Sequence, residues 1–133
     1  MIFVILSKLN NMDEKTELRN KYKRRFYDFT LELIKFIDNL PKTNVAYRIG
    51  DQLLRSGTSI IANYIEGQSA SSKKDFTNFI NHALKSANES KLWLSLLKDS
   101  KHCGDQDTTW LMQELIEISK ILASTVLSLK GKK

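Results

Sequence analysis

The stretch YKRRFYDFTLELIKFIDNL, residues 22–40, places an apolar or aromatic side chain at every third or fourth position. The positions that follow the spacing 4, 3, 4, 3, 4 are Tyr22, Phe26, Phe29, Leu33, Phe36 and Leu40. This heptad spacing makes one face of an α-helix apolar, so it predicts a helix that packs against other helices. Asp13 and Glu14 suit the positive end of a helix dipole, and Pro41 disfavours a helical residue before it. We therefore predict a helix over residues 13–40.

The same spacing recurs in three later segments. A second helix is expected over residues 44–66, a third over 73–100 and a fourth over 107–129. The clearest apolar seam is in the third segment: Phe76, Ile80, Ala83, Ala87, Ser90, Leu94 and Leu97. Short connections between long helices force neighbours to be antiparallel. The predicted fold is all-α, an antiparallel up-down-up-down four-helix bundle.

The length and composition fit one domain. The chain has 133 residues, of which 41% are hydrophobic, enough for a single core. We assign residues 13–130 to the bundle, residues 1–12 to an extension that is disordered or docks on a partner, and residues 131–133 to a basic tail. The apolar run 2–6 is too short to cross a membrane. A lone cysteine, Cys103, excludes an intrachain disulfide and fits the reducing cytoplasm.

Three local signals predict how the helices begin, end and pack. Glu66 is expected to close the second helix, with Gly67 as a left-handed residue after it. Ser72 and Asp75 have the spacing of a capping box, and Asp105 or Asp107 can cap the fourth helix. Glycine inside a helix is unfavourable by about 1 kcal/mol relative to alanine. Gly57 in the second helix therefore predicts the close approach of a neighbouring backbone.

The charges are unevenly distributed. The chain carries 21 basic and 15 acidic residues, a formal net charge of +6. The topology brings together the start of the first helix, the corner between the second and third, and the end of the fourth. The candidate nucleic-acid-binding residues of this end are Arg19, Lys21, Lys23, Arg24, Arg25, Lys73, Lys74 and Lys130. Such a surface can bind phosphates by releasing counterions. The alternative is that these are solvated helix ends that aid solubility.

A polar stripe runs along the second predicted helix and another along the third. The candidate members of the two stripes are Arg55, Ser59, Asn63, Glu66, Ser86 and Glu89. We interpret them as a hydrogen-bonded network that fixes register between helices or subunits. The catalytic alternative uses Glu66 as a base and Arg55 as an anion clamp.

The remaining sequence offers little for catalysis. His102 and Cys103 are adjacent and so point in different directions, and the chain has no phosphate loop and no nucleophile motif. We expect no enzyme activity, metal, cofactor or small-molecule substrate. Surplus apolar residues suggest either a subunit interface or the filling of a wide core: Tyr47, Tyr64, Leu92, Trp93, Leu96, Trp110 and Met112.

Residues 59–90, SIIANYIEGQSASSKKDFTNFINHALKSANES, resemble the signature of a known family. Its members are four-helix-bundle proteins encoded by intervening sequences in bacterial large-subunit ribosomal RNA genes. The matching residues are Ser59, Ile60, Asn63, Glu66, Gly67, Ser72, Lys74, Phe76, Phe79, Ala83, Ser86 and Glu89. The resemblance extends over residues 14–130.

This resemblance implies a homopentameric barrel of four-helix bundles. It also covers the accessory variability protein of diversity-generating retroelements, which is basic and associates with reverse transcriptase and RNA. The resulting expectation is a non-enzymatic homo-oligomer that binds RNA, a reverse transcriptase or both as an accessory factor, with no membrane partner. The alternative is a protein–protein scaffold or assembly protein.

Overall fold

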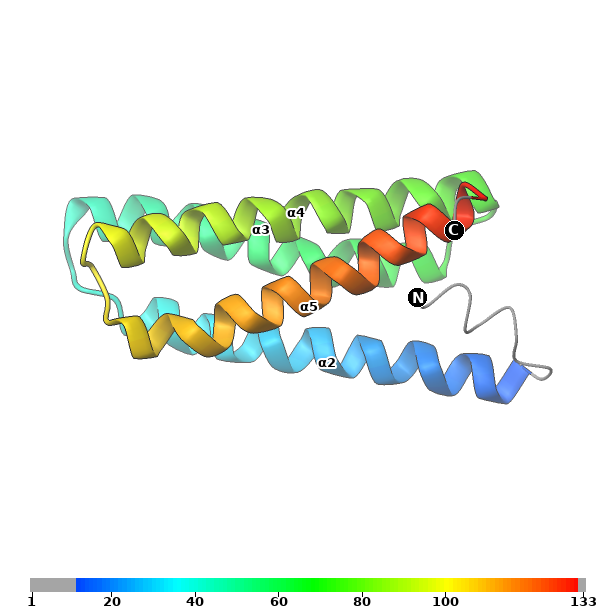
Figure 1. The fold of residues 1–133 in the computed structure, drawn as a ribbon, viewed down its shortest axis with the longest axis horizontal. Coiled ribbons are helices and arrows are strands. Elements are labelled where there is room, and N and C mark those ends of the chain that lie inside the picture. The colour runs from blue at the N-terminus through cyan, green and yellow to red at the C-terminus, as the bar shows by residue number, and fades with distance from the viewer. Residues whose placement is uncertain (1–11, 132–133) are drawn as a thin grey trace.

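Four long helices form the described part of the chain, residues 12–131 (Figure 1). The computed structural model describes residues 12–131, so residues 1–11 of the proposed extension and the last two residues of the tail lie outside that range, while Met12 belongs to the first helix. The helices are α2 (Met12–Asp38), α3 (Asn44–Gln68), α4 (Lys73–Asp99) and α5 (Asp105–Leu129). Successive helices run in opposite directions, and residues 12–131 contain no strand. The predicted all-α four-helix bundle is confirmed.

The heptad positions build the core. Phe26, Phe29 and Leu33 of α2 are fully buried, as are Leu94 and Leu97 of α4. One residue assigned to the surplus apolar set belongs here instead, since Tyr64 is only 1% exposed. Its ring meets Phe26 edge to face, with centroids 4.9 Å apart at 82°. The interface reading of Tyr64 is therefore wrong, because the wide core uses it as filling.

The helix starts follow the capping rules in part. The Ser72 hydroxyl accepts a hydrogen bond from the Asp75 backbone N–H at 3.1 Å, as predicted. The Asp75 carboxylate instead accepts from the Ser71 hydroxyl at 3.2 Å, so only one of the two capping-box bonds forms as expected. At α5 the Asp107 carboxylate accepts from the Gly104 N–H at 3.2 Å. Asp107 is thus the capping residue of the two candidates.

The end of α3 differs from the prediction. The helix continues through Gly67 to Gln68, and the Ser69 N–H closes it by donating to the Glu66 carbonyl at 3.1 Å. Gly67 is buried and helical, and a Cβ there would lie 3.2 Å from Cβ of Phe79. Gly67 therefore permits close packing against α4 and does not supply a left-handed turn.

Gly57 also allows a close approach, but of a different kind from the one predicted. The neighbour is the side chain of Leu33, not a backbone. A Cβ built on Gly57 would overlap Leu33 Cδ2. Leu33 is fully buried on α2, so the absence of a side chain at Gly57 creates the space that its branched end occupies.

Replacing Gly57 with alanine tests this packing. Alanine is a better helix former by about 1 kcal/mol, so an uncrowded site would gain stability. We expect Gly57→Ala to lose about 1–3 kcal/mol instead, because Leu33 must leave its rotamer or the helices must separate. Urea denaturation followed by circular dichroism measures the difference.

The control is a double-mutant cycle with Leu33→Ala. In the Leu33→Ala background the methyl group added at position 57 meets free space, so Gly57→Ala should become neutral or stabilising. A stabilising Gly57→Ala in the otherwise unchanged protein would show that the two residues do not crowd each other.

Candidate nucleic-acid interface

Three basic segments meet at one end of the bundle. Figure 1 shows the start of α2, the α3–α4 connection and the end of α5 at the same end of the long axis. The cations that project from them are all exposed: Lys21, Lys23, Arg24, Lys73, Lys74 and Lys130. We call this group, together with the partly exposed Arg19, the basic end.

Arg25 does not share this environment. Its Nε donates to Glu114 Oε2 at 3.1 Å and its Nη2 donates to Glu114 Oε1 at 2.8 Å. Glu114 belongs to α5, and its side chain is only 16% exposed. The hydrogen bond to Glu114 raises the pKa of Arg25, so the guanidinium stays charged. Arg25 therefore joins α2 to α5, with its charge balanced within the protein.

Arg24 remains accessible although it has partners. Its Nε lies 3.1 Å from Asp28 Oδ1 one turn along α2, and its guanidinium lies 5.8 Å from the centre of the Tyr27 ring. Both side chains of the ion pair are more than half exposed, 73% for Arg24 and 52% for Asp28. Such surface pairs contribute about 0–1 kcal/mol, so an anion can compete for Arg24.

Two hollows at the basic end are lined by cations. One, of about 380 Å³, is lined by Arg19, Gly67, Gln68, Ala70, Ser72, Lys73, Phe76 and Leu129. We call it the terminal pocket. The other, of about 460 Å³, lies between α2 and α3 and is lined by Asn20, Lys23, Arg24, Tyr27, Ile61 and Ile65. Neither set of described residues includes a carboxylate, so each hollow has a positive wall.

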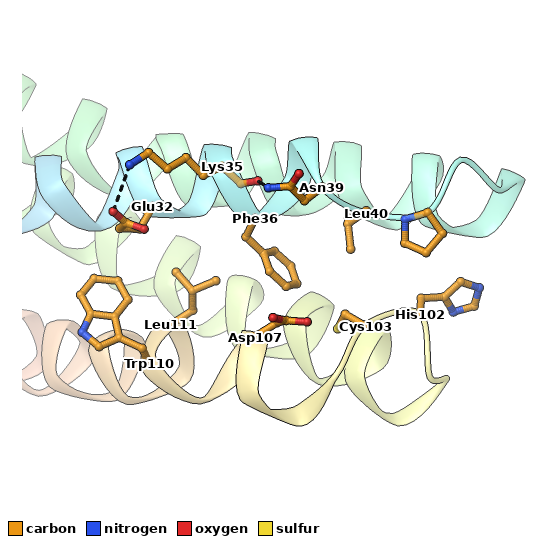
Figure 2. A pocket seen from close by; sticks show the side chains of 11 residues that line it. Glu32, Lys35, Phe36, Asn39, Leu40, His102, Cys103, Asp107, Trp110 and Leu111 are labelled. Atoms are coloured by element: carbon orange, nitrogen blue, oxygen red, sulfur yellow. Dashed lines mark hydrogen bonds and ion pairs between the residues drawn. The ribbon is translucent and has the colours of Figure 1, made fainter.

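The opposite end has a different chemistry. A cavity of about 610 Å³ lies where the end of α2 faces the α4–α5 connection and the start of α5 (Figure 2). Its walls are largely apolar, with Phe36, Leu40 and Trp110 among them, and it contains the carboxylates of Glu32 and Asp107. Glu32 pairs with Lys35 at 3.4 Å. Acidic and basic groups alternate here, which makes this end a poor site for a polyanion.

Cys103 and His102 border this second cavity without forming a reactive pair. Burial, with help from the charges of Asp107 and Asp105, raises the pKa of the Cys103 thiol, which disfavours the thiolate. His102 Nδ1 lies 2.7 Å from the Ser100 hydroxyl. Among residues 12–131 no group of three or more His, Cys, Asp or Glu side chains is arranged to hold a metal ion.

The structure brings together five members of the polar stripe. Arg55 bonds Glu89 at 2.7 Å across the α3–α4 interface, and the Ser86 hydroxyl donates to the Ser59 hydroxyl at 2.9 Å. Asn63 Nδ2 donates to Ser59 Oγ, also at 2.9 Å. The sixth, Glu66, is exposed and has no bond to the other five. Arg55, the anion clamp of the catalytic alternative, is thus bonded to Glu89.

A buried serine pair continues this line of contacts and was not singled out from sequence. Ser56 and Ser90 are 1% and 0% exposed, and their hydroxyl oxygens lie 2.8 Å apart. Ser90 also donates to the Ser86 carbonyl at 2.8 Å. The available signals were the small polar run around Ser56 and the seam position of Ser90. Together with the Ser59–Ser86 bond, this pair forms what we call the serine ladder between α3 and α4.

The protein is therefore an antiparallel four-helix-bundle protein in which the serine ladder joins α3 to α4 and cations gather at the basic end. No helix in residues 12–131 has the length and hydropathy that a membrane span requires. The model of the 23S rRNA-intervening sequence protein family matches residues 19–124, and the chain belongs to this family. The resemblance seen in residues 59–90 is thereby confirmed.

A solved relative supports the fold. A protein of unknown function from the S23 ribosomal protein family of Bacteroides thetaiotaomicron is 33% identical, with a TM-score of 0.76. The similarity covers 81% of this chain and 96% of that one. No curated protein matches the sequence.

Tyr64 provides a test of packing at the basic end. Its hydroxyl donates to the Arg19 carbonyl at 3.3 Å, and burial raises its pKa strongly above the usual value of about 10. Above pH 10 the unfolded chain loses this proton while the folded chain keeps it, so stability falls as pH rises. Tyr64→Phe should lose about 1 kcal/mol at pH 7, and the gap to wild type should close above pH 10.

The measurement is urea denaturation at pH 7, 10 and 11. Tyr47→Phe serves as the control, because Tyr47 is 63% exposed and this change should leave the pH dependence of stability as in the wild type. A constant difference between wild type and Tyr64→Phe across this range would contradict the buried position of the hydroxyl.

Proposed function

We propose that this protein is a non-enzymatic, basic homo-oligomer that binds RNA through its basic end. The observation that carries the proposal is the gathering of cations at one end of the bundle, where Arg19 and Lys73 line one hollow and Lys23 and Arg24 another, neither lining containing a carboxylate. Lys21, Lys74 and Lys130 add to the charge of the same end. Clustered cations bind a nucleic acid backbone mainly by displacing its counterions. The start of α4 adds the positive end of its dipole to the same surface.

The family supports RNA as the anionic partner. Its description connects its members with 23S rRNA genes. The resemblance to the retroelement accessory protein suggests a more specific form of the proposal, in which the partner is a reverse transcriptase bound to RNA. A protein that only held such a complex together would need no catalytic residues of its own.

Self-association is the second part of the proposal. Tyr27, Leu31 and Ile34 form an exposed apolar stripe on α2, and Ile65 of α3 is exposed beside the same α2–α3 hollow as Tyr27. Exposed apolar stripes of this kind favour burial between subunits. A homopentamer is the form that the family resemblance suggests. The same stripe favours the alternative function, a protein–protein scaffold.

Charge reversal at the basic end tests RNA binding. Lys21→Glu with Lys23→Glu should weaken binding of a structured RNA at least tenfold at low salt. The slope of log affinity against log salt should fall by about 1 per lysine. The control is Lys42→Glu with Lys98→Glu, which makes the same change in net charge on exposed residues near the opposite end. Fluorescence anisotropy over a salt series gives both quantities.

Equal weakening by the two double variants would contradict a localised site. Absence of binding by the wild type at low salt would remove RNA from the proposal. Capture of a protein partner unaffected by either double variant would then favour the scaffold alternative.

Light scattering tests self-association. The wild type should have a mass well above the 15.3 kDa of one chain. Leu31→Glu should lower that mass because it places a charge within the exposed stripe on α2, whereas Gln113→Glu on exposed α5 surface should leave it unchanged. A monomeric wild type would contradict the homo-oligomer.

A further inference from the structure

We propose that the terminal pocket binds a single unpaired nucleotide, with the phosphate on Arg19 and Lys73 and the base against Phe76. This inference rests on the proposed function, since it assigns an unpaired nucleotide of the bound RNA to the terminal pocket. It rests on three observations: an unpaired guanidinium nitrogen, the charges of the lining, and the combination of a cationic and an apolar wall.

Arg19 is unlike the other arginines of the chain. The chain has five arginines, and in the other four, Arg24, Arg25, Arg48 and Arg55, Nε bonds a neighbouring carboxylate or amide oxygen. The Nε of Arg19 is enclosed by protein atoms with no acceptor. Leaving a charged donor unsatisfied is unfavourable by about 1–3 kcal/mol or more. Because Nε itself is enclosed, an anion in the pocket would contact the terminal nitrogens of the guanidinium and offset the charge of the group.

The lining of the terminal pocket supplies further attraction for an anion. Lys73 stands with Arg19 in the lining, and none of the eight lining residues is acidic. Two acids stand next to lining residues in sequence: Glu66, which is exposed, and Asp75, whose carboxylate accepts from the Ser71 hydroxyl at 3.2 Å. Ser72 and Lys73 begin α4, where the first backbone N–H groups lack partners within the helix. A phosphate therefore meets two side-chain cations and the positive end of a helix.

The other wall of the pocket suits a base. Phe76 and Leu129 are apolar, and Gln68 adds an amide whose Nε2 donates to the Tyr64 carbonyl at 3.4 Å while Oε1 is available. A base stacked on an aromatic ring contributes about 1–3 kcal/mol. The volume of about 380 Å³ is within the range of small-ligand pockets and suits one nucleotide. Because stacking on Phe76 requires a base outside a duplex, the occupant is unpaired.

The first experiment compares two neighbouring cations of α2. Arg19→Gln should weaken binding of a single-stranded RNA oligonucleotide about tenfold, since it removes a charge-assisted hydrogen bond. Lys21→Gln removes the same charge from exposed surface on the same helix and should weaken binding no more than about threefold. Lys73→Gln gives a second pocket variant on an exposed residue, and circular dichroism melts verify that each variant folds.

The second experiment tests the base. Phe76→Leu keeps an apolar side chain but removes the ring, so it should weaken binding of the single strand and leave binding of a blunt duplex unchanged. Adenosine and uridine monophosphates should displace the single strand from wild type at lower concentration than inorganic phosphate does. They should displace it less effectively from Arg19→Gln.

The outcomes separate the pocket from the proposed function. If Arg19→Gln and Lys73→Gln weaken RNA binding no more than Lys21→Gln, the pocket assignment is wrong, while the basic end can still bind RNA. If inorganic phosphate competes as well as the nucleotides, the base has no role and the assignment is again wrong. If the nucleotides bind and RNA does not, the pocket stands and the RNA proposal fails.

Discussion

The packing of α3 against α4 depends on small side chains that let the two helices approach and on hydroxyl groups bonded between them. Ser56 meets Ser90, and Ser59 meets Ser86, at 2.8 and 2.9 Å. Ala83 and Ala87, which lie on α4 with Ser86 and Ser90, are fully buried. Of all helix pairs in the described structure, α3 and α4 make the most extensive contact. A shift in register would leave the buried hydroxyl groups unpaired, so the ladder fixes how the two helices align.

This alignment determines where the basic end lies. The serine ladder aligns α3 with α4 and so sets the position of the connection between them. Gly67 lets the last turn of α3 lie close to Phe76 and Phe79. Lys73 and Lys74 are placed by that connection. Two contacts hold α2 beside α3. The Tyr64 hydroxyl donates a hydrogen bond to the Arg19 carbonyl, and Leu33 packs against Gly57. Cations far apart in sequence are therefore gathered by packing contacts that involve none of their charged groups.

Periodicity was sufficient for the fold because it reports burial. The heptad positions Phe26, Phe29 and Leu33 are all fully buried, and the helix boundaries differ from prediction by no more than two residues at either end. Sequence patterns failed where one residue type can have two roles. A glycine such as Gly67 can end a helix or make room for a neighbouring side chain, and only the three-dimensional contacts show which role it has. Likewise, a tyrosine such as Tyr64 can face a partner subunit or fill the core.

The candidate site was less predictable because charge pairing depends on distant residues. Arg25 lies in an uninterrupted basic run in the sequence, yet its partner Glu114 is on α5, 89 positions away. No local pattern reveals that pair. The special position of Arg19 was equally hidden, since it depends on an acceptor that the fold does not provide.

Arg19 joins the structural and the functional arguments. Its backbone carbonyl accepts the buried Tyr64 hydroxyl and so fixes the place of α2 beside α3. Its side chain lines the terminal pocket with Nε enclosed and unpaired. Enclosure of Nε restricts the side chain, so the guanidinium loses less freedom when it binds an anion. The same packing that aligns the helices therefore also preorganises a cation, which is the arrangement that a phosphate site requires.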